Sequence, residues 1–185
     1  MMLTDAGQFF LDTLLQPYAA LLLLRFHLQW LRVPLRNPLG EFIILLTDPL
    51  VLRARRLIPA VRMLDIATFT LACIVEMAYL SATLWLHSYP MGVLLLPWAL
   101  LKLFKLSIYL LMGALFIEAL MSWTNPHTPF APIFRGITTP FLKPIRRFVA
   151  PAGNIDFSFM ILFFLCYAIL ALPVGWLEIL IMSAL

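Results

Sequence analysis

The chain has 185 residues, of which 63% are hydrophobic and only 12% are charged, and its mean hydropathy is +0.99. This composition lies far outside the range of soluble proteins and predicts an integral membrane protein. The net charge of +4 would suggest a nucleic-acid partner in a soluble protein, but here the basic residues lie beside apolar segments, so we expect no nucleic-acid partner.

Four segments are long and apolar enough to cross a bilayer, whose hydrocarbon core of about 30 Å requires about 20 residues of helix. They are Phe9 to Trp30, Ile66 to Leu86, Lys102 to Ser122, and Phe157 to Glu178. The sequence therefore predicts an all-α membrane protein with four transmembrane helices. The amino terminus carries no basic region, so we expect it to begin the first span and not to be a cleaved signal peptide.

Basic residues are concentrated in two of the connections between these spans. Six lie between the first and second spans and four lie between the third and fourth, out of 13 Lys and Arg residues in the chain. The positive-inside rule predicts that both connections are cytoplasmic. Both termini and the connection between the second and third spans are then expected outside, in a bacterial inner membrane.

Each basic connection also contains apolar residues at helical spacing. An apolar stripe that ends in a basic cluster is typical of an amphipathic helix that lies in the membrane surface. We expect Pro49 and Pro140 to end or kink these two helices, because proline lacks a backbone donor. The stripes are Leu39, Phe42, Ile43, Leu46 and Leu50 in the first connection, and Phe130, Ile133, Phe134, Ile137 and Phe141 in the second.

The remaining connection, Tyr89 to Leu101, is apolar but contains Pro90, Gly92 and Pro97. It is too short to span the membrane by itself. Three interpretations are open: an interfacial segment, a re-entrant segment, or a helix continuous with the third span.

The chain contains an internal repeat at an offset of 91 residues. A repeat of this kind implies two copies of one structural unit. We therefore predict a first repeat at 1–88, a connection at 89–101 and a second repeat at 102–185, and the two repeats are expected to be parallel. The matched residues are Thr47, Pro49, Arg55, Arg56 and Asp65 in TDPLVLRARRLIPAVRMLD, and Thr138, Pro140, Arg146, Arg147 and Asp156 in TTPFLKPIRRFVAPAGNID.

The pattern P-x5-RR-x8-D in each half, beside two spans, resembles the YggT family of small integral membrane proteins. The stretch TPFLKPIRRFVAPAGNIDFS is close to the family pattern, whereas the first half has Arg53 at the position of Pro144 and VRMLD where PAGNID is expected. The resemblance implies a bacterial inner-membrane protein associated with osmotic or extracytoplasmic stress tolerance, and chloroplast relatives that resemble cytochrome assembly factors. It implies no settled molecular activity.

The repeated motif supplies one set of candidate functional residues. Its basic residues either bind an acidic partner or anionic lipid headgroups, or serve only to fix the topology. Asp65 and Asp156 stand at the start of the second and fourth spans, where each carboxylate can cap the helix and can also pair with its own Arg pair. The basic residues are Arg55, Arg56, Lys143, Arg146 and Arg147.

Five charged residues inside the predicted spans form a second set, because an ionisable group is costly in the membrane. They are Asp12, Arg25, Glu76, Lys105 and Glu118. Arg25 matches Glu118 in depth and Asp12 matches Lys105, so each pair either joins the first and third spans or snorkels to the interfaces. Glu76 has no obvious partner, so it is either protonated and hydrogen-bonded or part of a hydrated path.

The sequence shows no metal-ligand spacing, no phosphate-binding loop and no nucleophile beside a base, so we expect no catalysis, cofactor or metal. We expect a scaffold or assembly factor for a membrane complex, with anionic lipids and another membrane protein, or a second copy of itself, as partners. The alternative is a pathway for an ion or solute, with potassium as one candidate, formed by an oligomer.

Overall fold

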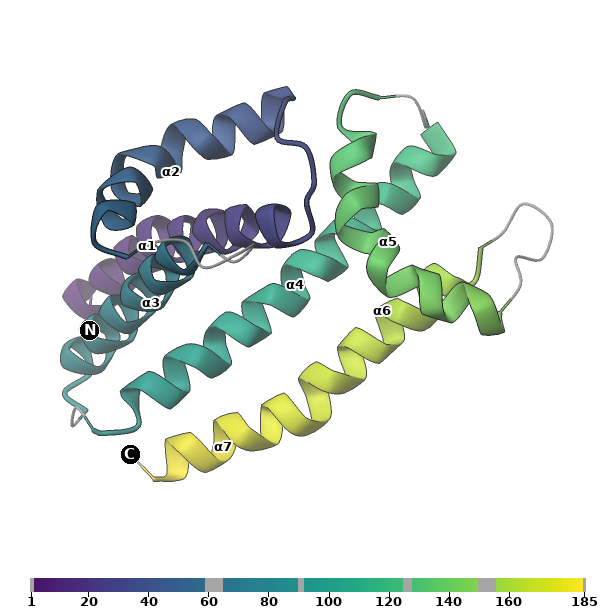
Figure 1. Ribbon diagram of the computed structural model, residues 1–185. Helices are drawn as coiled ribbons and strands as arrows, with labels where there is room; N and C mark the ends of the chain where they lie inside the picture. The colour runs from purple at the N-terminus through teal and green to yellow at the C-terminus, as the bar shows by residue number, and fades with distance from the viewer. Residues whose placement is uncertain (1, 59–64, 90–91, 125–127, 150–155, 185) are drawn as a thin grey trace.

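The computed structural model describes residues 2–58, 65–89, 92–124, 128–149 and 156–184, and this part of the chain contains helices and no strands (Figure 1). The prediction of an all-α protein is therefore confirmed. The elements in chain order are α1 (Met2–Trp30), α2 (Pro38–Leu57), α3 (Ile66–Leu86), α4 (Leu95–Thr124), α5 (Ala131–Phe148), α6 (Ser158–Ile169), the π-helical segment η1 (Leu170–Val174) and α7 (Gly175–Ser183).

Four helical stretches within the described residues are long and apolar enough to cross a membrane, namely Thr4–Trp30, Ile66–Leu86, Leu95–Ser122 and Ser158–Ser183. Their order agrees with the four predicted spans, and the second has the predicted bounds. The third begins at Leu95, seven residues before the predicted Lys102. Residues 95–101 are thus continuous with the third span, as the third interpretation of this connection proposed, whereas residues 90–91 lie outside the described residues.

The fourth span is one helical rod with a π-helical segment inside it. Pro173 lies in η1, where the backbone N–H of Gly175 donates to the carbonyl of Leu170, five residues earlier. Proline has no backbone donor and its ring collides with the carbonyl four residues before it, so the widened turn relieves both problems. The helix therefore continues through Pro173 to Ser183.

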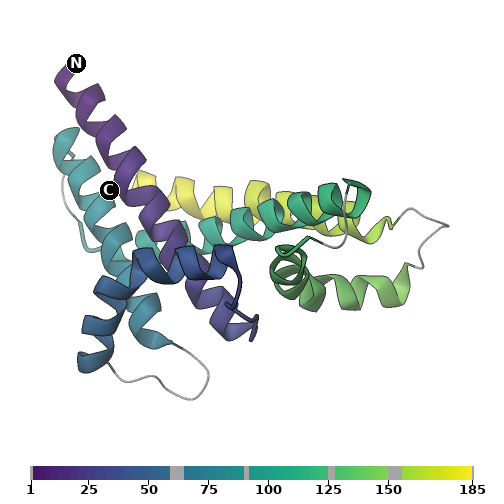
Figure 2. The same cartoon turned by 90° about the horizontal axis from the view of Figure 1, so that it is seen from above.

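Helices α2 and α5 occupy the two basic connections, and both bend partway along their length (Figures 1 and 2). Each contains proline in its interior, Pro49 in α2 and Pro140 with Pro144 in α5. The repeated prolines therefore kink these helices and do not end them. A proline kink is expected where a backbone hydrogen bond is missing.

One face of α2 and one face of α5 are buried against the rest of the protein. Ile43, Thr47 and Val51 in α2 are fully buried, while Phe42 and Leu45 remain 52% and 72% exposed. In α5 the buried residues include Ile133, Ile137 and Leu142. The predicted apolar stripes are consequently divided between the protein core and the outer surface.

A buried apolar cluster joins the two halves of the chain. Leu28 and Val33 from the first half lie in one cluster with Ala114, Ile133 and Ile137 from the second. Large apolar side chains on the outside remain uncovered, and Phe164 and Ile179 of the fourth span are 63% and 68% exposed. An outer surface of this kind is expected of helices that face hydrocarbon.

The spans of the first half pack closely, since α1 and α3 share the most extensive interface between any two helices of the described chain. The amino end of α1 and the carboxyl end of α7 lie toward the same side of the molecule, and the carboxyl ends of α2 and α5 lie away from them (Figure 2). The basic ends of α2 and α5 are thus separated from both termini.

Candidate functional site

The repeated motif forms the same ion pair in both halves of the chain. Arg55 Nη2 lies 2.5 Å from Asp65 Oδ2, and Arg146 Nη2 lies 2.7 Å from Asp156 Oδ2. The paired residues are ten positions apart in both cases. We call these two ion pairs the latches, because each joins the basic end of α2 or α5 to the start of the span that follows it.

Each latch carboxylate also binds backbone at the start of that span. Asp65 is the N-cap of α3 and accepts hydrogen bonds from the backbone N–H of Thr68 at 3.3 Å and from its hydroxyl at 2.5 Å. Asp156 accepts from the backbone N–H of Ser158 at 2.9 Å. Helix capping and pairing with arginine therefore occur together at Asp65, whereas Asp156 lies one residue before Phe157, the N-cap of α6, and combines its ion pair with one backbone contact.

The first latch is more enclosed than the second. Asp65 is 5% exposed, and the Gln29 amide of α1, oriented with its nitrogen toward the carboxylate, donates to Asp65 at 2.8 Å and accepts from Arg55 at 3.1 Å. In the second latch the Asp156 side chain is 26% exposed, and the Arg146 guanidinium lies 5.4 Å from the centre of the Phe159 ring. Equivalent positions in the repeat thus occupy different environments.

Both latch carboxylates have a pKa below the ordinary value for aspartate. Burial alone raises the pKa of Asp65, but hydrogen bonds from Arg55 and Thr68 and the charge of Arg55 outweigh it. Burial also raises the pKa of Asp156, and hydrogen bonds from Ser158 and Arg146 outweigh it in the same way. Hydrogen bonds and a cation favour the charged form of an acid, so both carboxylates are held ionised.

The second arginine of each repeated pair is not part of a latch. Arg56 and Arg147 are exposed, as is Lys143, and none of the three forms an ion pair or hydrogen bond with the described residues. Each half therefore uses one arginine to fix the end of its helix and presents the next one outward. Residues 61–64 and 151–155, where the halves differ as VRML and PAGNI, lie outside the described residues.

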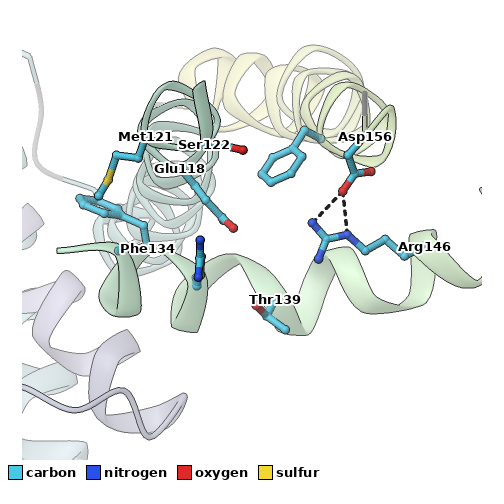
Figure 3. Close-up of a pocket in the computed structure, with 10 residues that line it drawn as sticks. Glu118, Met121, Ser122, Phe134, Thr139, Arg146 and Asp156 are labelled. Carbon is cyan, nitrogen blue, oxygen red and sulfur yellow. Dashed lines mark hydrogen bonds and ion pairs between the residues drawn. The ribbon is translucent and has the colours of Figure 1, made fainter. Parts of the chain in front are cut away.

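A polar pocket of about 260 Å³ lies beside the second latch, between α4, α5 and α6 (Figure 3). Glu118 and Ser122 of α4 face Arg146 and Asp156 across it. Glu118 accepts a hydrogen bond from the Thr138 hydroxyl, which connects α4 to α5. The residues that line the pocket are Glu118, Met121, Ser122, Ala131, Phe134, Arg135, Thr139, Arg146, Asp156 and Phe159.

Neither depth-matched pair predicted between the first and third spans forms. Arg25 is 3% exposed, and its Nη1 instead lies 2.7 Å from Asp48 and donates to the Thr47 hydroxyl at 2.6 Å. This contact joins α1 to α2. The reason is that α2 folds back along α1 and brings a closer carboxylate to the guanidinium than Glu118.

The other predicted pair is replaced in the same way. Lys105 Nζ lies 2.6 Å from Glu178 of α7, and Lys102 lies 3.5 Å from the same carboxylate. Asp12 accepts from the hydroxyl of Tyr79 at 2.8 Å. Two cations of α4 therefore share one carboxylate of α7, and Asp12 makes a polar contact between α1 and α3.

Glu76 lies in the interface between α1 and α3 and is 1% exposed. Gln16 donates to its Oε1 at 3.3 Å, whereas Oε2 has no hydrogen-bond partner in the described chain. No partner for Glu76 could be identified from the sequence, because the contact depends on how α1 packs against α3. An unsatisfied buried carboxylate oxygen is unusual and marks this residue for functional testing.

Sequence reasoning missed Asp48, Glu178, Gln16 and Gln29 as contributors to these contacts. Asp48 directly follows the repeated Thr47, and Glu178 is the last residue of the predicted fourth span, so both were visible as nearby carboxylates. Gln16 and Gln29 are uncharged, so the pattern of charges in the sequence did not mark them as partners. Among the described residues, no group of three or more His, Cys, Asp or Glu side chains is placed to hold a metal ion.

Comparison with known proteins gives a consistent family assignment. The family model described as CCB3/YggT matches residues 4–86 and again residues 97–177. The chain is 33% identical over 162 residues to the uncharacterized protein YggT of Escherichia coli K12, covering 87% of this chain and 85% of that protein.

Two further relatives have the same degree of similarity. An uncharacterized protein in the proC 3' region of Vibrio alginolyticus is 33% identical over 86% of this chain and 88% of its own length. An uncharacterized protein of Haemophilus influenzae is 33% identical over 84% of both chains. No solved structure matches.

Proposed function

This chain belongs to the CCB3/YggT family, and on that premise we propose that it is a non-catalytic scaffold or assembly factor for a complex of the bacterial inner membrane. These relatives are uncharacterized, and the chain's own geometry supports the proposal. The proposed biological setting, tolerance of osmotic or extracytoplasmic stress, follows from the family resemblance.

One observation carries the proposal. In each half the latch fixes the end of a helix, and the next arginine, Arg56 or Arg147, is exposed with no partner in the described chain. Two cations held at fixed positions suit an acidic partner or anionic headgroups, at about 1 kcal/mol for each basic residue near an anionic leaflet. Lys143, one turn before Arg147, adds to the second docking point.

The proposed placement in the membrane puts α2 and α5 at the cytoplasmic surface, both termini outside, and the two repeats parallel. It is supported by the bias of basic residues toward two connections and by the exposed apolar side chains of α2. In a variant that lacks Cys73 and Cys166, a thiol at Ser88 should react with a membrane-impermeant reagent from outside and a thiol at Asn154 should not. The reverse pattern would overturn this orientation.

The scaffold proposal is tested by removing the two exposed arginines while keeping both latches. Arg56→Gln with Arg147→Gln should reduce binding to vesicles that contain anionic lipid, or to a captured membrane partner, and should impair growth under osmotic stress. Topology should be retained because each connection keeps most of its cations. The readouts are vesicle co-flotation, pull-down from native membranes and growth at high osmolarity.

A control variant removes the same number of cations, both from the first basic connection, without touching the repeated pairs. Arg36→Gln with Arg53→Gln serves this purpose, because both residues are exposed and form no ion pair in the described chain. Equal losses in the two double variants would indicate nonspecific charge attraction, which would contradict a docking role for Arg56 and Arg147.

The second candidate function is an ion or solute pathway, and the buried, half-satisfied carboxylate of Glu76 favours it. Glu76→Gln keeps the shape of the side chain and removes its charge. On the scaffold proposal this variant should be mild at unchanged protein level. Loss of stress tolerance in Glu76→Gln, with normal behaviour of the Arg56 and Arg147 double variant, would favour the pathway.

A further inference from the structure

The polar pocket beside the second latch has balanced charge. Its lining includes the guanidinium groups of Arg135 and Arg146 and the carboxylates of Glu118 and Asp156. Two cations and two anions leave no net charge for a simple anion to neutralise. A phosphate alone would gain from the guanidinium groups but would be repelled by the two carboxylates.

Part of the hydrogen-bonding capacity in this pocket is unused. Arg146 donates to Asp156 through Nε and Nη2, at 2.9 and 2.7 Å. The hydroxyl groups of Ser122 and Thr139 line the pocket, and neither side chain has a hydrogen bond within the described chain. Both residues are exposed, so a ligand can reach them.

The position of the pocket favours a lipid over a free solute. It lies between the last turns of α4, which ends at Thr124, and the start of α6 at Ser158, and the proposed placement puts these ends of the spans at the membrane interface. Farther along α6, Met160 and Phe164 are 52% and 63% exposed and would meet acyl chains. Its volume of about 260 Å³ is smaller than a drug-sized site and suits a headgroup.

We propose that this pocket binds the headgroup of a zwitterionic phospholipid with a primary ammonium, phosphatidylethanolamine. The ammonium donates to Glu118, which faces the pocket, and the phosphate accepts from the Arg146 guanidinium and from Ser122 and Thr139. Charge-assisted bonds of this kind are about twice as strong as neutral ones. This site is separate from the exposed cations of the proposed function.

The first half of the chain carries different side chains at the equivalent positions. At an offset of 91 residues, His27, Leu31 and Ile44 stand where the second half has Glu118, Ser122 and Arg135. Gln29 also binds both members of the first latch from the side of α1. The two copies of the repeat therefore present different side chains beside their latches.

Binding can be measured by native mass spectrometry of the purified full chain, titrated with lipids that share the same acyl chains. Phosphatidylethanolamine should bind on the order of tenfold more tightly than phosphatidylcholine, whose quaternary ammonium cannot donate a hydrogen bond to Glu118. It should also bind more tightly than phosphatidylglycerol, which has no cation. Glycerophosphoethanolamine, the headgroup without acyl chains, should compete only weakly.

Two variants test the assignment of residues. Glu118→Gln removes the partner of the ammonium while keeping an acceptor for Thr138, so the preference for phosphatidylethanolamine over phosphatidylcholine should be lost. Ser122→Leu introduces the side chain that the first half carries and should exclude the headgroup. Glu41→Gln makes the same chemical change on the exposed surface of α2 and should leave the preference intact.

Four results would overturn the proposal. They are equal affinity for phosphatidylethanolamine and phosphatidylcholine in the unaltered protein, a preference for phosphatidylglycerol, competition by the free headgroup as strong as by the lipid, or a preference that survives in both Glu118→Gln and Ser122→Leu. None of these results depends on the exposed arginines, so the scaffold proposal is tested separately.

Discussion

The two latch aspartates occupy equivalent positions in the repeat but differ in burial, and replacing each by asparagine should separate the value of the ion pair from that of the contact with backbone N–H. Asparagine keeps a side-chain oxygen and accepts from backbone about as well as aspartate, so this contact is retained. Asp65→Asn leaves Arg55 without its anion in an enclosed site and should cost about 2 kcal/mol, whereas Asp156→Asn should cost less than about 1 kcal/mol. Thermal unfolding in detergent measures both, and equal losses would contradict the difference in environment.

The same carboxylates predict how stability depends on pH. Both have a folded-state pKa below the unfolded value of about 3.9, so their contribution is fully present above that value. It is lost as the pH falls below about 4 and each folded-state pKa is approached. The melting temperature should therefore fall in this range, and it should fall less in a variant that carries Asp65→Asn and Asp156→Asn. An unchanged acid profile in that variant would show that other groups control acid unfolding.

The Arg25 contact predicts a specific pattern of coupling. Arg25→Gln and Asp48→Asn should each destabilise the protein, and the combined variant should lose about 1 kcal/mol less than the sum, because either change alone breaks the same pair. Arg25→Gln with Glu118→Gln should be additive, since those residues share no hydrogen bond or ion pair in the structure. A thermodynamic cycle in detergent distinguishes the two, and additivity in the first pair would remove the proposed contact.

For individual residues, the sequence predicted the contacts that are repeated and local. It did not predict the contacts that depend on how helices pack. The ten-residue spacing of Arg55 and Asp65 recurs in the second half, so the latch could be anticipated from the pattern alone. Matching residues by their depth in the membrane did not identify the partner of Arg25. Depth counted along a span contains no information about which side of the helix a neighbour approaches, and α2 supplied the nearest anion.

At the level of the helices, the bend in α2 leads to a further prediction. Pro49 lies inside α2, one and a half turns before Arg55, which contacts Asp65 at the start of α3. Pro49→Ala restores a backbone donor and favours a straight helix, which should move Arg55 away from Asp65. The variant should therefore be less stable despite its better helix propensity.

The loss of stability in Pro49→Ala should depend on the latch between Arg55 and Asp65. If straightening acts by breaking the ion pair, Pro49→Ala should cost little more in a background that already carries Asp65→Asn. Thermal unfolding of the two single variants and the combined variant measures this coupling. Greater stability of Pro49→Ala than of the unaltered protein would show that the kink has no role in placing Arg55.

Helices were predicted well in position and poorly in length. Apolar composition located all four spans, but it could not place the start of the third, because Pro97 and the apolar residues before it fit several structures. Pro97 lies in the first turn of α4, where the missing backbone donor has no intrahelical partner in any case. The apolar stripes of α2 and α5 likewise did not reveal that one face packs on protein.

Considering the whole molecule, the two halves are connected at Gly136, and this contact can be tested by adding one methyl group. A Cβ at Gly136 would lie 2.6 Å from Cγ2 of Val33, on the segment that joins α1 to α2. Gly136→Ala should therefore destabilise the protein by about 1 to 2 kcal/mol, although alanine favours helix more than glycine does. Thermal unfolding in detergent measures the loss.

A compensating change identifies the cause. Val33→Ala removes the two methyl groups that a Cβ at Gly136 would meet, so the combined variant should recover part of the stability lost in Gly136→Ala. Val33→Ala alone should destabilise, because Val33 belongs to the cluster that joins the halves. A combined loss equal to the sum of the two single losses would indicate that the halves do not approach each other at this point.

The duplication and the apolar segments could be read from the sequence, but the way the halves contact each other could not. Leu28 and Ile137 are apolar residues of ordinary kind, and nothing in their spacing distinguishes contact between halves from contact with lipid. Apolar side chains suit both a contact between helices and a contact with lipid. Only the three-dimensional packing separates them.

The widened turn at Pro173 also determines the rotational phase of the last helix. Each residue turns an α-helix by about 100°, so a segment that accommodates one extra residue rotates everything beyond it relative to an uninterrupted helix. Glu178, which lies beyond this turn, meets Lys105 only in the rotated phase. Shortening η1 by one residue would carry the carboxylate roughly a quarter turn around the helix axis, away from both lysines of α4 and toward hydrocarbon.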